Sequence, residues 1–525
     1  MKKTIKKTIV FLVITSLFVS CTKDFEELNT DKTKLVGLDV ASLEYSFSAA
    51  ENRGIYSYAG QYQLGPGLFS DLQAQYFATT QKNFASDRNV MVANWLNAAW
   101  NFFYAAASPQ MDVVLEYTKP GGKLQDPMKY AIAKIYRVSM YLPITDNWGA
   151  IPYFQAGNGK KEVLYDSQED IYKDFLKTLK EATAVLSAYN GTGKFFEKGD
   201  IIYGGSPAKW LKFGNSMRLR VAMRISKKDP ALAKAEAEAA VAAPGGLLIS
   251  NADNANVSVS PIYTNPLGGY ANLGEFRMSS SMESVLKGFN DPRLPKFFAP
   301  ALNGGAYKGV RNGMTVTQMA DPTNSINVTS GINATNVSNS VTAAKDNEGK
   351  TPWTIFTAAE TYFLLAEGAL NGWNMGGTAA SFYNAGITAS LNQWSITGAE
   401  VTTYLAGTST PIALNDSYNT PAMTDIPVAF AATPDKQREQ IGTQKWLAIF
   451  PYSSEAWSEV RRTGFPKLYP RLNSDNLDSP ASDPLSIRRL PYPAIEAAVN
   501  AGGLASGISK LGGPDKSSTK LWWNP

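Results

Sequence analysis

Hydrophobic side chains recur at helical spacing along this chain, and that periodicity constrains its fold more than any other feature of the sequence. Apolar residues three or four positions apart form a stripe that a helix buries against its neighbours. Pro143 follows the stripe that runs from Met128 to Leu142, and it is expected to end that helix because proline lacks a backbone N–H. Helices are predicted over residues 89–117, 128–142, 167–186, 206–225, 231–243, 358–370, 379–394, 436–450 and 454–462.

The segments between the predicted helices indicate a mainly α fold with long polar loops. Successive helices lie close together in the sequence, as in helical hairpins of the tetratricopeptide type, although no strict 34-residue repeat is visible. Strand signals are confined to residues 247–250 and 257–262. Residues 303–350 and 397–434 are rich in Asn, Gly, Thr and Ser, and loops of that length are usually functional or disordered.

The scarcity of histidine and cysteine excludes several kinds of chemistry. The chain of 525 residues has no histidine and one cysteine, beside 11 Trp, 25 Tyr and 24 Phe. Nucleophile pairs and metal sites that need imidazole are therefore excluded, as are intrachain disulfides and CxxC redox pairs. Carboxylate, Lys, Tyr or Ser–Lys chemistry, or a hard cation held by oxygens, would remain.

The N-terminus resembles a bacterial lipoprotein signal. Four lysines precede the apolar run 8–20, which is too short to span a membrane as a helix, and Ser20 stands directly before Cys21, the only cysteine. We therefore predict a signal peptide over residues 1–20, acylation (for example with palmitate) at Cys21, and a tether over about 21–37. Phe18 occupies the position where leucine is preferred, and an ordinary signal peptide with an accidental cysteine is the alternative.

The net charge gives no reason to expect nucleic-acid binding. The chain has 50 basic and 45 acidic residues, and removing the four lysines at positions 2, 3, 6 and 7 leaves 46 basic residues. A nearly neutral mature chain lacks the excess of Lys and Arg that attracts phosphate backbones.

Six ordered motifs resemble those of the SusD/RagB family of outer-membrane lipoproteins, and the resemblance runs from Cys21 to about Asn500. Among them are the TDNWGAIPY turn, the KWLKFGNSMRLR helix and the EAWSEVRRTGFP segment. The motifs lie at residues 145–153, 209–220, 291–294, 358–367, 444–466 and 488–500.

The resemblance implies a fold, a location and a task. It implies one SusD-like domain over residues 21–525, built on four tetratricopeptide-like helix pairs with an irregular, loop-rich, ligand-facing half. Such a protein would be lipid-anchored at the cell surface of a Bacteroidetes outer membrane. It would bind an oligosaccharide or a peptide and deliver it to a SusC-like TonB-dependent barrel transporter, without acting as an enzyme.

Candidate ligand contacts are aromatic and polar residues outside the predicted helical stripes. A sugar offers apolar C–H faces and hydroxyl edges, so its binder needs flat aromatic platforms beside amide or charged side chains. The candidates are Tyr76, Arg88, Asn94, Trp95, Tyr270 and Tyr307.

Other conspicuous residues are expected to be structural. Arg461 and Arg462 should cap carbonyl groups or pair with acids, as arginines near a helix end usually do. Core or interhelix roles are expected for Trp148, Glu367, Trp446 and Trp457.

Two other functions stay open at this point: an adaptor that binds only proteins, and a surface glycosidase with paired carboxylates. No cofactor is expected, but a structural calcium ion could lie near Asp253 or residues 346–348, neither of which has EF-hand spacing. The sequence does not identify the ligand, and it does not decide whether Trp522 and Trp523 dock on the body or on a partner.

Overall fold

The structure is a computed structural model that describes residues 39–524 apart from 57–58, 259–264 and 338–350. The predicted signal peptide, Cys21 and the tether lie outside the described residues. The chain divides into two units, residues 1–43 and 44–525, and the fold below is that of the second unit.

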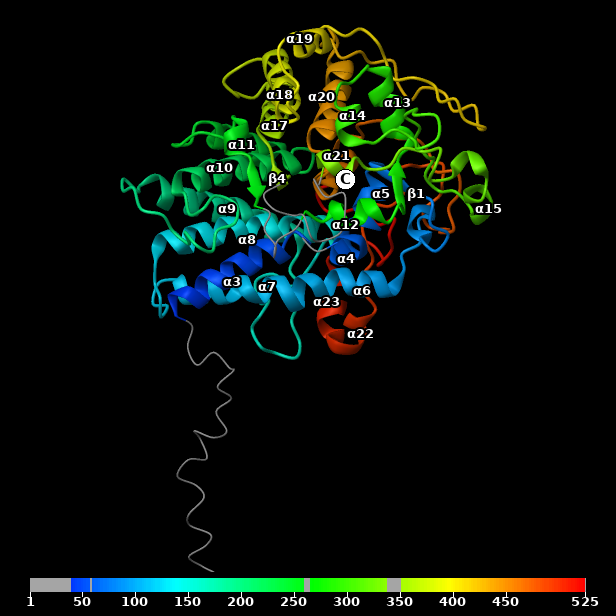
Figure 1. Cartoon of the computed structure of the whole chain (residues 1–525). Coiled ribbons are helices and arrows are strands. Elements are labelled where there is room, and N and C mark those ends of the chain that lie inside the picture. The colour runs from blue at the N-terminus through cyan, green and yellow to red at the C-terminus, as the bar shows by residue number, and fades with distance from the viewer. Residues whose placement is uncertain (1–38, 57–58, 259–264, 338–350, 525) are drawn as a thin grey trace, which may run out of the picture. The chain divides into compact units, whose positions relative to one another are not determined.

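Packed helix pairs form the regular part of this unit (Figure 1). Four pairs of consecutive helices, among those that contact each other, are consistent with the tetratricopeptide-like pairs that the family resemblance implies. The pairs are α7 (Ser108–Thr118) with α8 (Pro127–Trp148), α9 (Gln168–Ser187) with α10 (Pro207–Arg224), α17 (Ala358–Leu370) with α18 (Ala379–Gln393), and α20 (Pro434–Ala448) with α21 (Ser453–Thr463). Further contacts of α8 with α9, α10 with α17, and α17 with α20 join the pairs to one another.

Capping groups begin these helices where the sequence predicts. The Ser167 hydroxyl accepts a hydrogen bond from the Asp170 amide, and the Ser206 hydroxyl accepts one from the Lys209 amide. Each bond satisfies one of the amides that the first turn of a helix leaves unpaired. Helix α11 (Pro230–Val241) also begins at a proline, after the capping residue Asp229.

Two helix boundaries differ from the predictions. Helix α8 continues through Pro143 to Trp148, because the buried side chains Leu142, Ile144 and Trp148 gain more by packing than the proline costs. The helix predicted over 89–117 begins only at Ala93. It consists of α6 (Ala93–Asn101), a π-helical segment over Phe102–Ala107, and α7.

The rest of the unit is irregular, with short helices and two small sheets. Strand β1 (Phe77–Thr79) pairs antiparallel with β3 (Phe276–Met278), and β2 (Ala255–Val257) pairs antiparallel with β4 (Trp353–Phe356). The remaining helices are α3 (Val40–Arg53), α4 (Ala59–Tyr62), α5 (Ser70–Gln73), α12 (Leu267–Asn272), α13 (Ser280–Gly288), α14 (Leu294–Phe297), α15 (Val316–Met319), α16 (Ala334–Val337), α19 (Ala399–Leu405), α22 (Ile495–Val499) and α23 (Ala501–Ser509).

The strand predictions were mostly wrong. Residues 247–250 form no strand, and only Val257 of the predicted segment 257–262 belongs to one, while 259–264 lie outside the described residues. Strands of three or four residues carry too little alternation to be recognised without their partners. The mainly helical fold class is confirmed.

The C-terminal tryptophan docks on the body of the protein. Trp523 is fully buried, and its indole N–H donates to the Asp146 carboxylate at 2.8 Å. The backbone N–H of Trp522 donates to the Gln168 side chain at 3.0 Å, which holds the segment against the start of α9. The chain end therefore contributes to the core.

We predict that Trp523→Ala destabilises the protein by about 3–5 kcal/mol, because the change opens a large cavity and removes a donor from buried Asp146. Trp522→Ala is the matched control and should cost less than about 1.5 kcal/mol, since Trp522 is only half-buried and its backbone bond remains. Urea unfolding of both variants measures the difference. Equal losses would contradict the assignment of Trp523 to the core.

Candidate ligand-binding site

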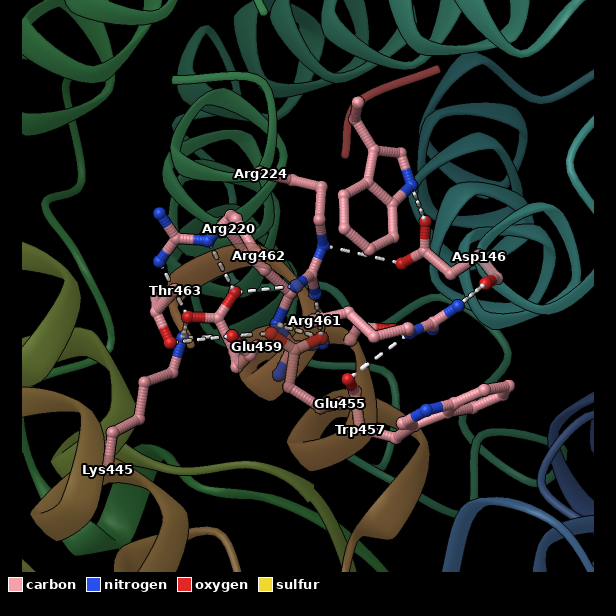
Figure 2. Close-up of polar contacts among 12 residues, drawn as sticks. Asp146, Arg220, Arg224, Lys445, Glu455, Trp457, Glu459, Arg461, Arg462 and Thr463 are labelled. Carbon is pink, nitrogen blue, oxygen red and sulfur yellow. Dashed lines mark hydrogen bonds and ion pairs between the residues drawn. The ribbon is translucent and has the colours of Figure 1, made fainter. Parts of the chain in front are cut away.

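The charged residues of the sequence motifs meet in a buried ion-pair network. Arg224 on α10 contacts Glu455 at 2.6 Å and Glu459 at 2.5 Å, and Lys445 on α20 contacts Glu459 at 2.9 Å. Figure 2 shows these side chains converging from separate helices. Burial alone would raise the pKa of Glu459, but Arg462, Lys445 and Arg224 hold it well below its usual range. The Glu459 carboxylate is therefore charged and paired.

The two adjacent arginines of the RRTG motif have the structural roles that the sequence predicts. The Arg462 guanidinium pairs with Glu367 at 2.5 Å and with Glu459 at 2.7 Å. The Arg461 guanidinium donates to the backbone carbonyls of Asp146 at 2.7 Å and Arg488 at 2.8 Å. Both arginines are buried, so neither presents a binding surface.

The tryptophans of the motifs are core residues, as predicted. Trp148, Trp446 and Trp457 are buried, and the Trp148 indole N–H donates to the Pro491 carbonyl at 3.2 Å. The Tyr492 hydroxyl donates to the Ala150 carbonyl at 2.7 Å, so the motif at 488–500 docks on the turn at 145–153.

Two predicted ligand residues do not reach the surface. Tyr76 is 0% exposed, and its hydroxyl donates to the Trp446 carbonyl at 2.6 Å. Tyr270 is 1% exposed and stacks on Phe276 with ring centroids 4.1 Å apart. Tertiary packing around these short segments covers both rings, so the two tyrosines support the irregular half from inside and are not exposed.

The other four candidates lie nearer the surface. Asn94 is exposed and Trp95 is half-buried on α6. Arg88 is held by Asp475 at 2.6 Å and donates to the Met314 carbonyl at 3.3 Å. Tyr307 is half-buried, and its backbone carbonyl accepts from Lys287 at 3.3 Å. These residues belong to the irregular half, as the family resemblance implies.

Six rings in contact join the surface residue Trp95 to the interior, and we call them the aromatic array. Phe84 packs edge-on against Trp95 at 5.9 Å and stacks on Phe276 at 5.5 Å. Offset and edge-to-face contacts at such distances add to the stability gained by burial. In order, the array is Trp95, Phe84, Phe276, Tyr270, Tyr62 and Trp353.

A polar cavity of about 310 Å³ lies beside the loop that contains Tyr307. Its lining includes Lys308, Arg311, Asp416 and the ring of Tyr418. The Arg311 guanidinium lies 5.9 Å from the centroid of that ring and 3.9 Å from the Asp416 carboxylate. An aromatic face beside both charged and amide groups suits a hydroxyl-rich ligand.

The sequence analysis missed these cavity residues. Arg311 and Tyr418 lie more than a hundred positions apart, within the polar segments 303–350 and 397–434, and no motif marks either of them. The polar composition of the two segments was the only signal in the sequence, and it could not show that they meet.

In the part of the chain that the structure describes, no cluster of three or more acidic or cysteine side chains is placed to hold a metal ion. Asp253 instead pairs with Lys212 at 3.0 Å. The other suggested calcium position, residues 346–348, lies outside the described residues. Among the described helices, none combines the length and the apolar character that crossing a membrane would require.

The structure combines a helical scaffold with an irregular part that has aromatic and polar side chains near its surface. The model of the SusD-like family, described as SusD and RagB outer-membrane lipoprotein, matches residues 22–524. The chain therefore belongs to the SusD/RagB family. Comparison with curated proteins gave no match.

Solved structures of family members resemble this one over nearly its whole length. A chitin-binding SusD homologue from Flavobacterium johnsoniae is 36% identical, with a TM-score of 0.83, over 92% of this chain and 98% of that one. A SusD homologue from Bacteroides vulgatus is 31% identical, with a TM-score of 0.82, over 91% and 97%. One from Bacteroides uniformis is 31% identical, with a TM-score of 0.81, over 93% and 100%.

Asp71 makes the aromatic array sensitive to pH. Its carboxylate accepts from the hydroxyls of Tyr62 at 2.9 Å and Tyr270 at 3.4 Å. Burial raises the pKa of Asp71 to about 7, although hydrogen bonds from Ser453, Tyr62 and Tyr270 oppose the rise. Between about pH 4 and pH 7 the folded state then holds a proton that the unfolded state has lost, so stability falls as pH rises through this window.

We predict that Asp71→Asn removes this dependence. The free energy of unfolding of the wild type should fall by roughly 3 kcal/mol more than that of the variant between pH 5 and pH 8. Urea unfolding of both proteins at pH 5 and pH 8 measures this difference. The contributions of other titrating groups are the same in the two proteins and therefore cancel. Parallel pH profiles would show that Asp71 is ionised throughout this range.

Proposed function

We propose that this chain is a cell-surface lipoprotein, anchored through Cys21, that binds an oligosaccharide and delivers it to a SusC-like TonB-dependent transporter of the outer membrane. Its membership of the SusD/RagB family carries the proposal. The chitin-binding homologue, similar over 92% of this chain, supports an oligosaccharide rather than a peptide as the ligand.

The irregular half offers the surface for this task. Trp95 supplies a half-buried indole ring at the surface end of the aromatic array, and Asn94, the preceding residue of α6, is exposed. Loops of the same irregular half add Tyr307 and the cavity lined by Arg311, Asp416 and Tyr418. Aromatic faces pack against the C–H face of a sugar, and the polar groups bond its hydroxyls.

The closely spaced acids of the buried ion-pair network do not form a glycosidase site. A glycosidase needs two carboxyl groups placed on either side of a bound sugar. Glu455 and Glu459, which lie close enough to share the partner Arg224, are buried in the ion-pair network. They therefore support the protein interior and are not available to a substrate.

We predict that Trp95→Ala weakens binding of chitin oligosaccharides at this surface by roughly tenfold or more, because the change removes the stacking platform. Isothermal titration calorimetry measures the affinity. The control is Tyr45→Ala, which removes an aromatic ring that is 77% exposed on α3 and should leave the affinity unchanged. Equal affinity of the wild type and the Trp95 variant would exclude this surface.

A second prediction concerns anchoring and the partner. Native protein solubilised from outer membranes in mild detergent should co-purify with a large β-barrel protein, identified by mass spectrometry. Cys21→Ser should abolish acylation and move the protein out of the membrane fraction, because its attachment depends on the lipid. Recovery of the acylated protein alone, even after crosslinking, would contradict delivery to a transporter.

A further inference from the structure

A second cavity, of about 490 Å³, lies where the sheet of β2 and β4 meets the C-terminal ends of α18 and α20. We call it the amide cavity, because amide side chains dominate its polar lining. It shares no lining residue with the cavity beside Tyr307. Its lining includes Asn254, Asn256, Trp353, Asn392, Gln393 and Trp394.

The lining has unused hydrogen-bonding capacity. Asn256 accepts from the Thr354 hydroxyl at 2.7 Å, which leaves the two donors of its amide nitrogen without a bond to any described residue. The indole N–H groups of Trp353 and Trp394, and the side-chain oxygen of Asn251, are buried and have no partner among the described residues. Buried polar atoms are nearly always paired in folded proteins, so a group of them around one cavity indicates a site for a polar ligand.

The charge of the lining selects the class of ligand. Among the described residues that line the cavity, Lys296 is the one charged residue and none is acidic. Amide groups both donate and accept, so they suit hydroxyl and acetamido groups, which also do both. A neutral, hydroxyl-rich ligand fits this lining better than a charged peptide, whose ionic groups would need opposite charges here.

The aromatic rings of the cavity are held in place by the core. Trp353 is 4% exposed and packs edge-on against Tyr62 at 5.3 Å, as the inner end of the aromatic array. Trp394 is half-buried and packs edge-on against Phe297 at 4.9 Å. Rings that are already fixed lose little conformational freedom when a ligand binds.

We propose that the amide cavity is a second saccharide-binding site, which takes neutral sugar units bearing hydroxyl or acetamido groups. This inference rests on the proposed function, since it assigns the cavity to the same class of nutrient. It adds a position on the chain that is separate from the surface at Trp95 and Tyr307.

Filling the cavity tests the proposal. Asn392 is exposed, lines the cavity and lies near the end of α18, so Asn392→Trp should block the site without disturbing the core. Asn384→Trp is the matched control, because Asn384 is an exposed asparagine of the same helix that does not line the cavity. Calorimetry with short oligosaccharides of chitin, cellulose and starch gives the number of sites and their affinities.

We expect two sites per chain in the wild type for at least one of these oligosaccharides. Asn392→Trp should lose one site and Trp95→Ala the other, while Asn384→Trp keeps both. Trp394→Phe, which retains an aromatic ring but removes the indole N–H, should weaken the site that Asn392→Trp abolishes by roughly threefold to tenfold.

Two results would overturn the inference, and they are distinguishable. If Asn392→Trp binds as many sugars as the wild type, with unchanged affinities, the amide cavity is not a binding site and the proposed function stands. If the folded wild type binds none of the three classes, the inference fails together with the assignment of an oligosaccharide ligand.

Discussion

The buried ion pairs between α10, α17, α20 and α21 are the interaction on which the rest of this structure depends. Arg220 pairs with Glu360 at 2.6 Å, Arg224 pairs with Glu455 and Glu459, and Lys445 pairs with Glu459. Loss of one partner from a buried pair costs about 3–5 kcal/mol, because the remaining charge stays in a medium of low dielectric constant. Exposed pairs such as Lys173 with Glu169 contribute little, because solvent screens the attraction between their charges.

The difference in energy between buried and exposed ion pairs explains why the charged residues of the motifs identify the fold of the protein but not its ligand. The buried side chains of Arg220 and Arg224 pair with acids from other helices, so the network specifies how the helices meet. Arg462, for example, draws Glu367 of α17 to its own helix α21. Ligand-facing loops are free of this requirement and can differ between members of the family without loss of the scaffold.

The sequence predicted the scaffold well, because helix periodicity and capping are local signals. Ser167 and Ser206 begin helices as predicted, whereas Pro143 did not end one because tertiary packing outweighs its local cost. The candidate site was predicted less well. Tyr76 and Tyr270 lie in segments whose mixture of aromatic and amide side chains is typical of a binding surface. Their rings are nevertheless buried by contacts with residues distant in sequence. Arg311 and Tyr418 meet only through the fold, and therefore no local pattern identified them.

A protein without histidine can recognise a sugar through aromatic and amide side chains. Indole faces, phenol rings and carboxamides bind sugars without transferring a proton, so a site built from them needs no group that titrates near neutral pH. Asp71 does titrate there, but it lies beneath the surface, hydrogen-bonded to Tyr62 and Tyr270. A change of pH would therefore first alter the hydrogen bonds that hold Tyr62 and Tyr270 in the aromatic array. It would affect the proposed ligand surface only through these two rings. Buried charge is concentrated in the ion-pair network of the scaffold, whereas neutral amide groups dominate the polar lining of the amide cavity.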